Sequence, residues 1–299
     1  MNSHVSLTSV FQNAETIHFT NQDKFVLFSD CHRGDKSFSD DFLHNKHIYN
    51  YALNYYFENG YSYIELGDGD ELWENRDFET IYSAHEDTFH ILKKFEKSDR
   101  LILLYGNHDI DWKNEFNVKF LLNKIVYEHL QVREAVCLVY DHNMDQQLFL
   151  VHGHQVDRKS DKWWKFSRFM VRHVWRHLQK IGFNDPTSPA KNYRKRNKVE
   201  TQLMEWSRAN QVPLIAGHTH RPRIPTTKNS LYFNTGSCVH PDCICGIEIK
   251  DGKINTVKWA IRPDSEGVMK IMAKRENERP IATLFESSSQ PAVATTAPQ

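Results

Sequence analysis

The sequence predicts an α/β fold built around parallel strands, and two observations support this. In the first half of the chain, short apolar runs typical of buried strands alternate with stretches of helical pattern. Five apolar runs end abruptly in polar clusters rich in Asp, Asn and His. With 299 residues, 39% of them hydrophobic, the chain can bury a large core. We expect one domain over residues 20–286 and a disordered Pro-, Ala- and Thr-rich tail over 287–299.

The elements can be placed in order along the chain. The expected strands are 25–29, 61–66, 101–105, 147–151, 213–216, 231–234, 244–249 and 253–260. Helices are expected at 41–58, which Asn59-Gly60 would end, and at 78–97. The early strand–helix–strand alternation predicts parallel neighbours, because parallel strands need a crossover between them. Asp251-Gly252 is a two-residue hairpin signal, so the last two strands should be antiparallel.

Composition narrows the classes of function. Lys and Arg number 38 and so do Asp and Glu, so the net charge predicts neither nucleic acid nor a membrane as partner. The five cysteines form no regular framework, which favours reduced thiols and a cytoplasmic location. Cys243 and Cys245 fit small residues of a buried strand. The N-terminus lacks a signal-peptide pattern, and no apolar run reaches the ~20 residues of a transmembrane helix.

The polar clusters that end five of the strands suit a metal site. They are SDCH (29–32), GDGDE (67–71), GNHD (106–109), HGH (152–154) and GHTH (217–220). Ligands of parallel α/β sheets bind beyond the carboxyl ends of the strands, so we expect the clusters to meet in one crevice. Carboxylate, amide and imidazole groups without thiolates suit a divalent metal such as Mn, Fe, Zn or Co. The candidate ligands are Asp30, His32, Asp68, Asn107, His152, His218 and His220.

The series D-x-H, GD, GNHD, H-G and GHTH resembles the motifs of the calcineurin-like dinuclear metallophosphoesterase superfamily, over residues 25–237. The resemblance implies a four-layer α/β/β/α sandwich, in which helices flank two sheets. It also implies two divalent metal ions at the strand ends, with Mn expected first. One ion would be bound by Asp30, His32, Asp68 and His220. The other would be bound by Asp68, Asn107, His152 and His218, so that Asp68 bridges the two.

Such a centre would hydrolyse phosphoesters through a metal-bridging hydroxide. His108 follows the ligand Asn107, and we expect it to act as general acid or to stabilise the leaving group. Asp109 would orient the His108 ring and raise its pKa, or cap a helix, or do both. Substrate contacts are expected from Arg33, Glu71, Trp73 and His154. The alternative for Arg33 is an exposed position, and the alternative for His154 is a place behind the metal ligands. Cys31 should point away from its two neighbours and pack in the core.

Three features resemble one branch of the superfamily, the UDP-2,3-diacylglucosamine diphosphatases, which cleave a pyrophosphate. They are GDGDELW (67–73), a long helical insertion between HGH and GHTH, and GHTHRP (217–222). His108 is a departure, because that branch usually has arginine there. We therefore expect hydrolysis of a phosphodiester or pyrophosphate in a small or lipid-linked substrate. The alternatives are a phosphomonoesterase or Ser/Thr protein phosphatase, with a nuclease ranked below them.

The insertion is expected to form a helical cap over residues 157–211. It contains an amphipathic pattern at 162–181, with aromatic and aliphatic residues on one side and Lys and Arg on the other, followed by the basic run KNYRKRNK (191–198). The basic face can be a solvated surface, a lid over an anionic substrate, a peripheral contact with an anionic membrane, or a nucleic-acid groove. We favour the lid, because two ligand clusters bracket the insertion.

Overall fold

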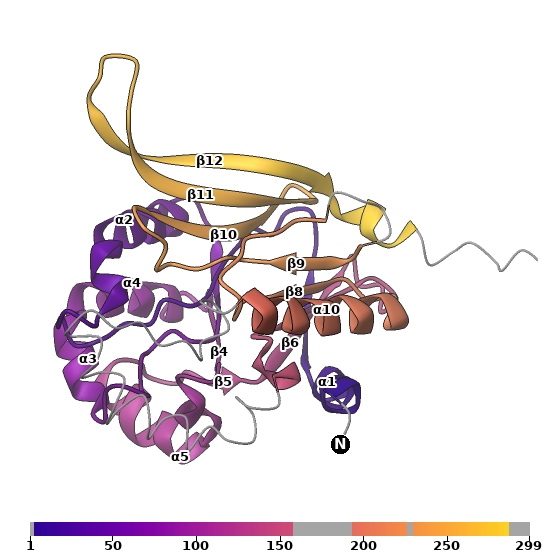
Figure 1. Cartoon of the computed structure of the whole chain (residues 1–299), viewed down its shortest axis with the longest axis horizontal. Helices are drawn as coiled ribbons and strands as arrows, with labels where there is room; N and C mark the ends of the chain where they lie inside the picture. Colours follow the sequence, from indigo (N-terminus) through magenta and orange to yellow (C-terminus); the bar gives the residue numbers. More distant parts are fainter. Residues whose placement is uncertain (1–2, 158–192, 226–229, 287–299) are drawn as a thin grey trace, which may run out of the picture.

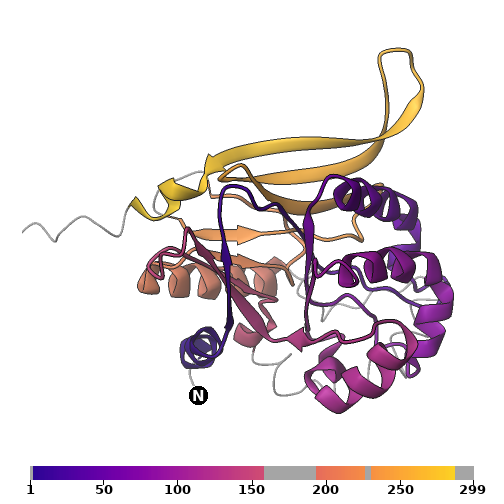
Figure 2. The same ribbon diagram turned by 180° about the vertical axis from the view of Figure 1, so that it is seen from behind.

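A computed structural model describes residues 3–157, 193–225 and 230–286 of the chain (Figure 1). Two β-sheets face each other, and helices cover both outer faces (Figures 1 and 2). This four-layer arrangement confirms the α/β/β/α sandwich that the sequence resemblance implied. No helix among the described residues is both long and apolar enough to cross a bilayer.

The larger sheet has the strand order β12-β11-β10-β2-β3-β4-β5. Its strands are β2 (Phe25–Phe28), β3 (Ser62–Leu66), β4 (Leu101–Leu104), β5 (Val132–Arg133), β10 (Cys243–Lys250), β11 (Lys253–Pro263) and β12 (Met269–Pro280). Strands β2 to β5 are parallel, as the alternation with helices predicted. Strands β10 to β12 add antiparallel neighbours, and Lys250 pairs with Lys253 across the predicted Asp251-Gly252 turn.

The smaller sheet has the order β1-β6-β7-β8-β9. Its strands are β1 (Glu15–Phe19), β6 (Ala135–Tyr140), β7 (Gln147–Val151), β8 (Leu214–Ala216) and β9 (Tyr232–Asn234). Strands β7, β8 and β9 run parallel, so their carboxyl ends share one edge. The five clusters therefore come from two sheets, with β2, β3 and β4 in one and β7 and β8 in the other.

The apolar core has three parts, which follow the layers. Between the sheets, side chains such as Leu27 and Ile64 of the larger sheet pack against Leu138 and Leu150 of the smaller one. On the outer face of the larger sheet lie α2 (Lys46–Glu58), α3 (Phe78–Ala84) and α4 (Glu86–Glu96). On the outer face of the smaller sheet lie α1 (Ser3–Gln12) and α10 (Tyr193–Asn210).

Shorter helical segments connect these elements. They are η1 (Asp41–His44), η2 (Ile110–Lys113), α5 (Glu115–Asn117), η3 (Val118–Leu122), α6 (Asn123–Ile125), η4 (His154–Val156) and η6 (Ile281–Leu284). The helix predicted over 78–97 is divided at His85, whose backbone leaves the helical region at φ −129°. The buried His85 ring lies 2.8 Å from a carboxylate oxygen of Asp40, so a long-range contact divides a pattern that locally favours one helix.

Two expected boundaries change. The fold begins before residue 20, because β1 pairs with β6 and Leu7 of α1 is buried against the smaller sheet. In the expected cap over 157–211, α10 packs Val199, Leu203 and Trp206 on the smaller sheet, so this stretch belongs to an outer helix layer. The amphipathic pattern at 162–181 and the tail at 287–299 lie outside the described residues.

Candidate metal centre

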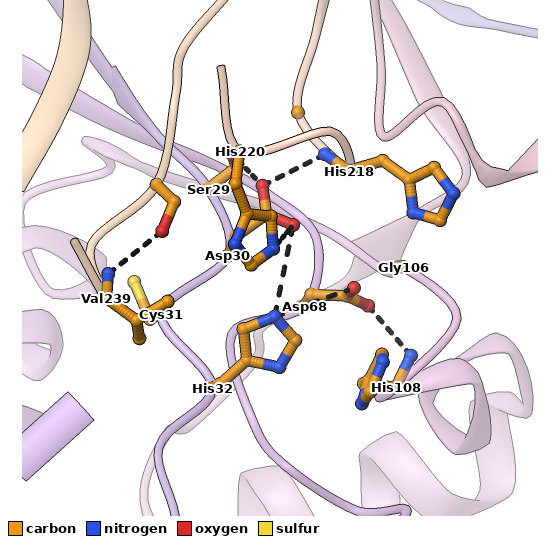
Figure 3. A network of polar contacts seen from close by, with 12 residues as sticks. Ser29, Asp30, Cys31, His32, Asp68, Gly106, His108, His218, His220 and Val239 are labelled. Atoms are coloured by element: carbon orange, nitrogen blue, oxygen red, sulfur yellow. Dashed lines mark hydrogen bonds and ion pairs between the residues drawn. The ribbon is translucent and has the colours of Figure 1, made fainter. Parts of the chain in front are cut away.

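The edge where β2, β3, β4, β7 and β8 end carries all of the candidate ligands. The loops that leave β2 and β3 stay paired with each other beyond the strands, since the Asp30 and His32 amides donate to the carbonyls of Gly67 and Asp68. The loop after β8 joins them, because the His218 amide donates to Asp30 Oδ2 at 3.0 Å (Figure 3). The two sheets are thus held together at the site.

Asp30, His32 and His220 form the first group of candidate metal ligands. Their ligand atoms lie within 4.8 Å of one another. His220 Nε2 is 3.1 Å and His32 Nε2 is 4.0 Å from Asp30 Oδ1. The Ser29 hydroxyl and the His218 amide both contact Oδ2 of Asp30, which leaves Oδ1 facing the two rings.

Asp68, His152 and His218 form the second group, which is buried. Asp68 Oδ2 lies 3.1 Å from His152 Nε2 and 4.0 Å from His32 Nε2 of the first group. The carboxylate of Asp68 therefore lies between the two groups, where the sequence resemblance expects a bridging ligand. Its other oxygen, Oδ1, accepts a hydrogen bond of 2.7 Å from the His108 amide (Figure 3).

Buried polar atoms without hydrogen-bond partners test whether these residues fit metal ions. Within the part of the chain that the structure describes, five such atoms belong to candidate ligands: Asp30 Oδ1, His32 Nε2, Asn107 Oδ1, His152 Nε2 and His218 Nε2. A buried polar atom without a partner is destabilising, and native proteins rarely keep several in one place. Nitrogen and oxygen donors without thiolates suit borderline or hard divalent cations. The residues therefore fit divalent metal ions at both groups.

Left-handed backbone angles occur at the same positions, and at eight other non-glycine residues of the described ranges. Five candidate ligands have left-handed φ angles between 49° and 64°: Asp30, His32, Asp68, His218 and His220. Non-glycine residues hold such angles only where their surroundings impose them, and they cluster at functional sites. Close approach also demands glycine, since a Cβ on Gly106 would lie 2.1 Å from Asp68 Oδ1, and one on Gly217 would lie 2.6 Å from Asp30 Oδ2.

Hydrogen bonds to the ring nitrogens fix which atom each histidine presents. His152 Nδ1 donates to the Leu66 carbonyl at 2.7 Å. His32 Nδ1 donates to Glu71 Oε2 at 2.8 Å. In both rings Nε2 is therefore the free ligand atom, and a metal-binding histidine usually has such an outer partner.

His108 lies beside the two groups and is partly exposed, at 23% of its side chain. Its Nδ1 is 2.9 Å from Glu71 Oε1, and its ring stacks on Trp73 with centroids 4.3 Å apart. Burial alone would lower the pKa of His108, but the carboxylates of Glu71 and Asp68 outweigh it and raise the pKa to about 10. Burial raises the pKa of Glu71, but the rings of His108 and His32 lower it to about 2. Glu71 thus contacts both His32, a candidate metal ligand, and His108, the expected general acid.

Asp109 has a different place from the one expected. Its carboxylate accepts hydrogen bonds from the backbone amides of Gly106, at 2.6 Å, and Gly69, at 2.8 Å. Asp109 stands at the N-cap position of η2, but its side chain makes no capping hydrogen bond, and Glu71 contacts the His108 ring. The carboxylate of Asp109 is thus bonded to backbone amides and not to the His108 ring, and a role of Asp109 in orienting His108 stays a prediction. Asp109 instead ties the loop after β4 to the loop after β3, which carries Asp68.

Arg33 also differs from the expectation. Its side chain is 1% exposed, and its guanidinium makes hydrogen bonds of 2.7 and 2.8 Å to Glu65 and of 2.8 Å to Asp70. These buried carboxylates occupy the guanidinium, and the expected contact between Arg33 and substrate stays a prediction. Cys31 is buried and points away from the ligands, as expected (Figure 3).

His154 and Trp73 lie next to the candidate ligands. His154 is 2% exposed, with its ring centroid 5.5 Å from that of His152. Burial, and then the rings of His152 and His218, hold the pKa of His154 well below its usual value, so the His154 ring is neutral.

Asp157 is a further residue of the site that the sequence patterns did not indicate. Its Oδ2 lies 3.8 Å from His218 Nε2 and 3.0 Å from Lys195 Nζ. The signal for it was an acid in the turn directly after HGH.

The calcineurin-like phosphoesterase family matches residues 23–222, about two thirds of the chain. The chain belongs to this family. This calcineurin-like phosphoesterase is therefore a metal-dependent hydrolase of phosphoesters. The described residues form a third group that could hold an ion, His32, Glu71 and His108, and the first two groups are compatible with a pair of ions. No curated protein matches the sequence.

Two solved structures are similar to this chain over most of their length. Vacuolar Protein Sorting 29 from Cryptosporidium parvum is 14% identical, with a TM-score of 0.40, and the match covers 85% of this chain and 97% of that chain. A conserved uncharacterized protein from Streptococcus pneumoniae, described as a predicted phosphoesterase, is 13% identical. Its TM-score is 0.32, with 84% of this chain and 98% of that chain covered. At these values neither structure bears on the activity.

Proposed function

We propose that this phosphoesterase hydrolyses a phosphodiester or pyrophosphate bond in a small or lipid-linked substrate, with two divalent ions bound at the strand ends. The observation that carries the proposal is the pair of adjacent ligand groups, whose buried Nε2 and Oδ1 atoms lack partners within the described residues. One ion would be held by Asp30, His32, Asp68 and His220. The other would be held by Asp68, Asn107, His152 and His218. When bound, such ions supply an activated water and neutralise charge on the phosphoryl oxygens.

His108 is the proposed general acid. Glu71 holds Nδ1 of the ring, so Nε2 is the atom that can give a proton to the leaving group. Stacking on Trp73 fixes the plane of the ring, and the raised pKa keeps the proton on it near neutral pH. Glu71 and Trp73 thereby act on the substrate through His108. His154, neutral and buried beside His152, is proposed to support that ligand and not to contact substrate.

The resemblance to UDP-2,3-diacylglucosamine diphosphatases supports a diester or pyrophosphate substrate. That branch usually has arginine where this chain has His108, and the difference is chemical. A guanidinium stabilises an anionic leaving group but cannot give up a proton, whereas an imidazolium can. A phosphate leaves readily as an anion, and an alkoxide needs a proton. His108 thus favours an alkoxide leaving group, so the diester is the first choice.

A substrate panel tests the proposal. The purified protein, supplied in turn with Mn²⁺, Zn²⁺, Fe²⁺ and Co²⁺, is offered bis-p-nitrophenyl phosphate, p-nitrophenyl phosphate and a nucleotide-sugar pyrophosphate. We expect turnover of the diester and pyrophosphate to exceed that of the monoester, with Mn²⁺ most effective. Asp68→Ala and His108→Ala should lose most activity, whereas His90→Ala, at an exposed histidine on α4, should keep it. Full activity in Asp68→Ala would refute the dinuclear mechanism.

The same panel separates the alternatives. Preference for the monoester or for phosphopeptides would indicate a phosphomonoesterase or Ser/Thr protein phosphatase. DNA binding that weakens steeply with salt would indicate a nuclease. A cytoplasmic location stays a prediction of the sequence. The lid at 162–181 and its contact with an anionic membrane also stay predictions, because those residues lie outside the described ranges.

A further inference from the structure

His32, Glu71 and His108 form a third group of metal-binding side chains, beside the two groups expected to hold the metal pair. Oε2 of Glu71 lies 2.8 Å from Nδ1 of His32 and 2.8 Å from Nδ1 of His108. The two rings meet edge to face, with their centroids 4.6 Å apart (Figure 3). Two imidazole nitrogens thus converge on one carboxylate oxygen, and the three ligand atoms lie within 4.8 Å of one another.

The distances between these atoms suit a zinc ion. Zinc binds imidazole nitrogen and carboxylate oxygen at about 2.0–2.2 Å, so two of its tetrahedral ligands lie about 3.4 Å apart. Each contact of 2.8 Å is now a hydrogen bond that spans one proton. Replacing both protons with one ion requires each contact to open by about 0.6 Å, which small side-chain rotations supply. Two histidines and one glutamate, with a fourth position open to water, are a ligand set that proteins use for zinc.

An ion can reach this group from solvent. The His108 side chain is 23% exposed, and those of His32 and Glu71 are 12% and 9% exposed. Trp73 stacks on the His108 ring and holds it in place. The carboxylate of Glu71 attracts a cation, and the ring of His32 separates the ion from the first ligand group. Ions on the two nitrogens of one imidazole ring lie about 6 Å apart.

We propose that this third group binds an inhibitory zinc ion when zinc is present in excess over the metal pair. The ion binds Nδ1 of His32, Nδ1 of His108 and the carboxylate of Glu71, and each Nδ1 releases one proton to solvent. His32 then carries an ion on each ring nitrogen, as an imidazolate. His108 loses the cationic form from which it gives a proton. The inhibition rests on the proposed function, whereas binding of the ion does not.

Two features make the site specific to zinc and to this chain. Zinc binds a given set of nitrogen and oxygen ligands more tightly than manganese does, so manganese can fill the metal pair without filling the third group. Arginine, which the diphosphatase branch usually has in place of His108, has only donors and stays protonated, so it offers no ligand atom. The third group therefore exists because His108 is a histidine.

Zinc stoichiometry tests the binding. Metal-free protein is dialysed against increasing Zn²⁺, and bound zinc is counted by elemental analysis. The wild type should bind one zinc per chain more than His108→Phe, which removes Nδ1 and keeps an aromatic ring against Trp73. His47→Phe, the same change at an exposed histidine of α2, should bind as much zinc as the wild type. Equal zinc in the wild type and His108→Phe, with both folded by circular dichroism, would overturn the proposal.

Anomalous diffraction at the zinc edge locates the ions in crystals soaked with Zn²⁺. We expect a peak within bonding distance of Nδ1 of His108 and the carboxylate of Glu71. No peak there, with the groups around Asp68 filled, would overturn this inference and leave the proposed function intact. Empty groups around Asp68 would instead refute the proposed function. The crystals need no variant, so this measurement is independent of whether His108→Phe folds.

Kinetics tests the inhibition. Hydrolysis of a glycerophosphodiester, whose leaving group is an alkoxide, should rise up to two equivalents of zinc per chain. The third equivalent should lower kcat by about 100-fold or more, to the rate of zinc-loaded His108→Phe, because the general acid is lost. His47→Phe should show the same rise and fall as the wild type. A rate that stays constant as the third zinc binds would overturn the inhibitory role.

Discussion

Glu71 contacts both a candidate metal ligand, His32, and the proposed general acid, His108. Replacing Glu71 with glutamine therefore gives the sharpest prediction. Oε2 of Glu71 lies 2.8 Å from Nδ1 of both His32 and His108, and Oε1 lies 2.9 Å from Nδ1 of His108. Glutamine keeps the shape of the side chain but turns one oxygen into an NH₂ group, which cannot accept a hydrogen bond. The NH₂ group therefore removes at least one of these contacts, and the lost negative charge weakens those that remain, in a site where Glu71 itself is only 7% exposed.

The size of the effect follows from the role of the lost bond. Loss of an outer partner of a metal-binding histidine lowers metal affinity about 10- to 100-fold, equivalent to about 1.4–2.7 kcal/mol. We therefore expect Glu71→Gln to bind Mn²⁺ at least 10-fold more weakly at the site of His32, and to lose kcat through His108 as well. Glu86→Gln, at an exposed glutamate of α4, is the control, because it removes the same charge away from the metal centre.

Isothermal titration of the metal-free protein with Mn²⁺ measures the affinity, and circular dichroism establishes that each variant is folded. Equal affinities in wild type, Glu71→Gln and Glu86→Gln would refute the argument that Glu71 orients His32. A loss of kcat with unchanged metal affinity would assign Glu71 to His108 alone.

Three further predictions concern stability. Trp206→Ala should lower the free energy of unfolding by about 3–5 kcal/mol, because the indole is fully buried against Phe11 and Phe149. Urea denaturation measures this change. An unchanged midpoint would contradict the claim that the packing of Trp206 stabilises the fold. Arg33→Met should cost a similar amount, about 3–5 kcal/mol, because Glu65 and Asp70 stay buried without their partner. A higher KM with an unchanged free energy of unfolding would instead indicate that Arg33 contacts the substrate. Chelation of divalent ions should lower Tm. Added Mn²⁺ should restore Tm and raise it with the logarithm of the free Mn²⁺ concentration above Kd, since a ligand that binds only the folded state stabilises it. An equal Tm with and without metal would contradict the proposal that the folded protein binds divalent ions.

Several elements could be predicted only in part. β6, an apolar run of AVCLVY, has a plain strand pattern that the sequence analysis overlooked. β1 and β12 lie at sheet edges and carry exposed polar residues, so their sequences have no clear apolar pattern. The helix at 78–97 is interrupted by a contact between His85 and Asp40, which local pattern cannot reveal.

The sequence by itself determined the fold class and the set of candidate ligands, because a strand end followed by a polar cluster is a local pattern. Asp30, His32, Asp68 and their partners can be read from it, although their roles stay predictions. Only the tertiary structure decided what Arg33, Glu71 and Asp109 do. Each bonds to groups far along the chain, such as Glu65, His108 and Gly69, and the burial of a charge depends on what packs around it.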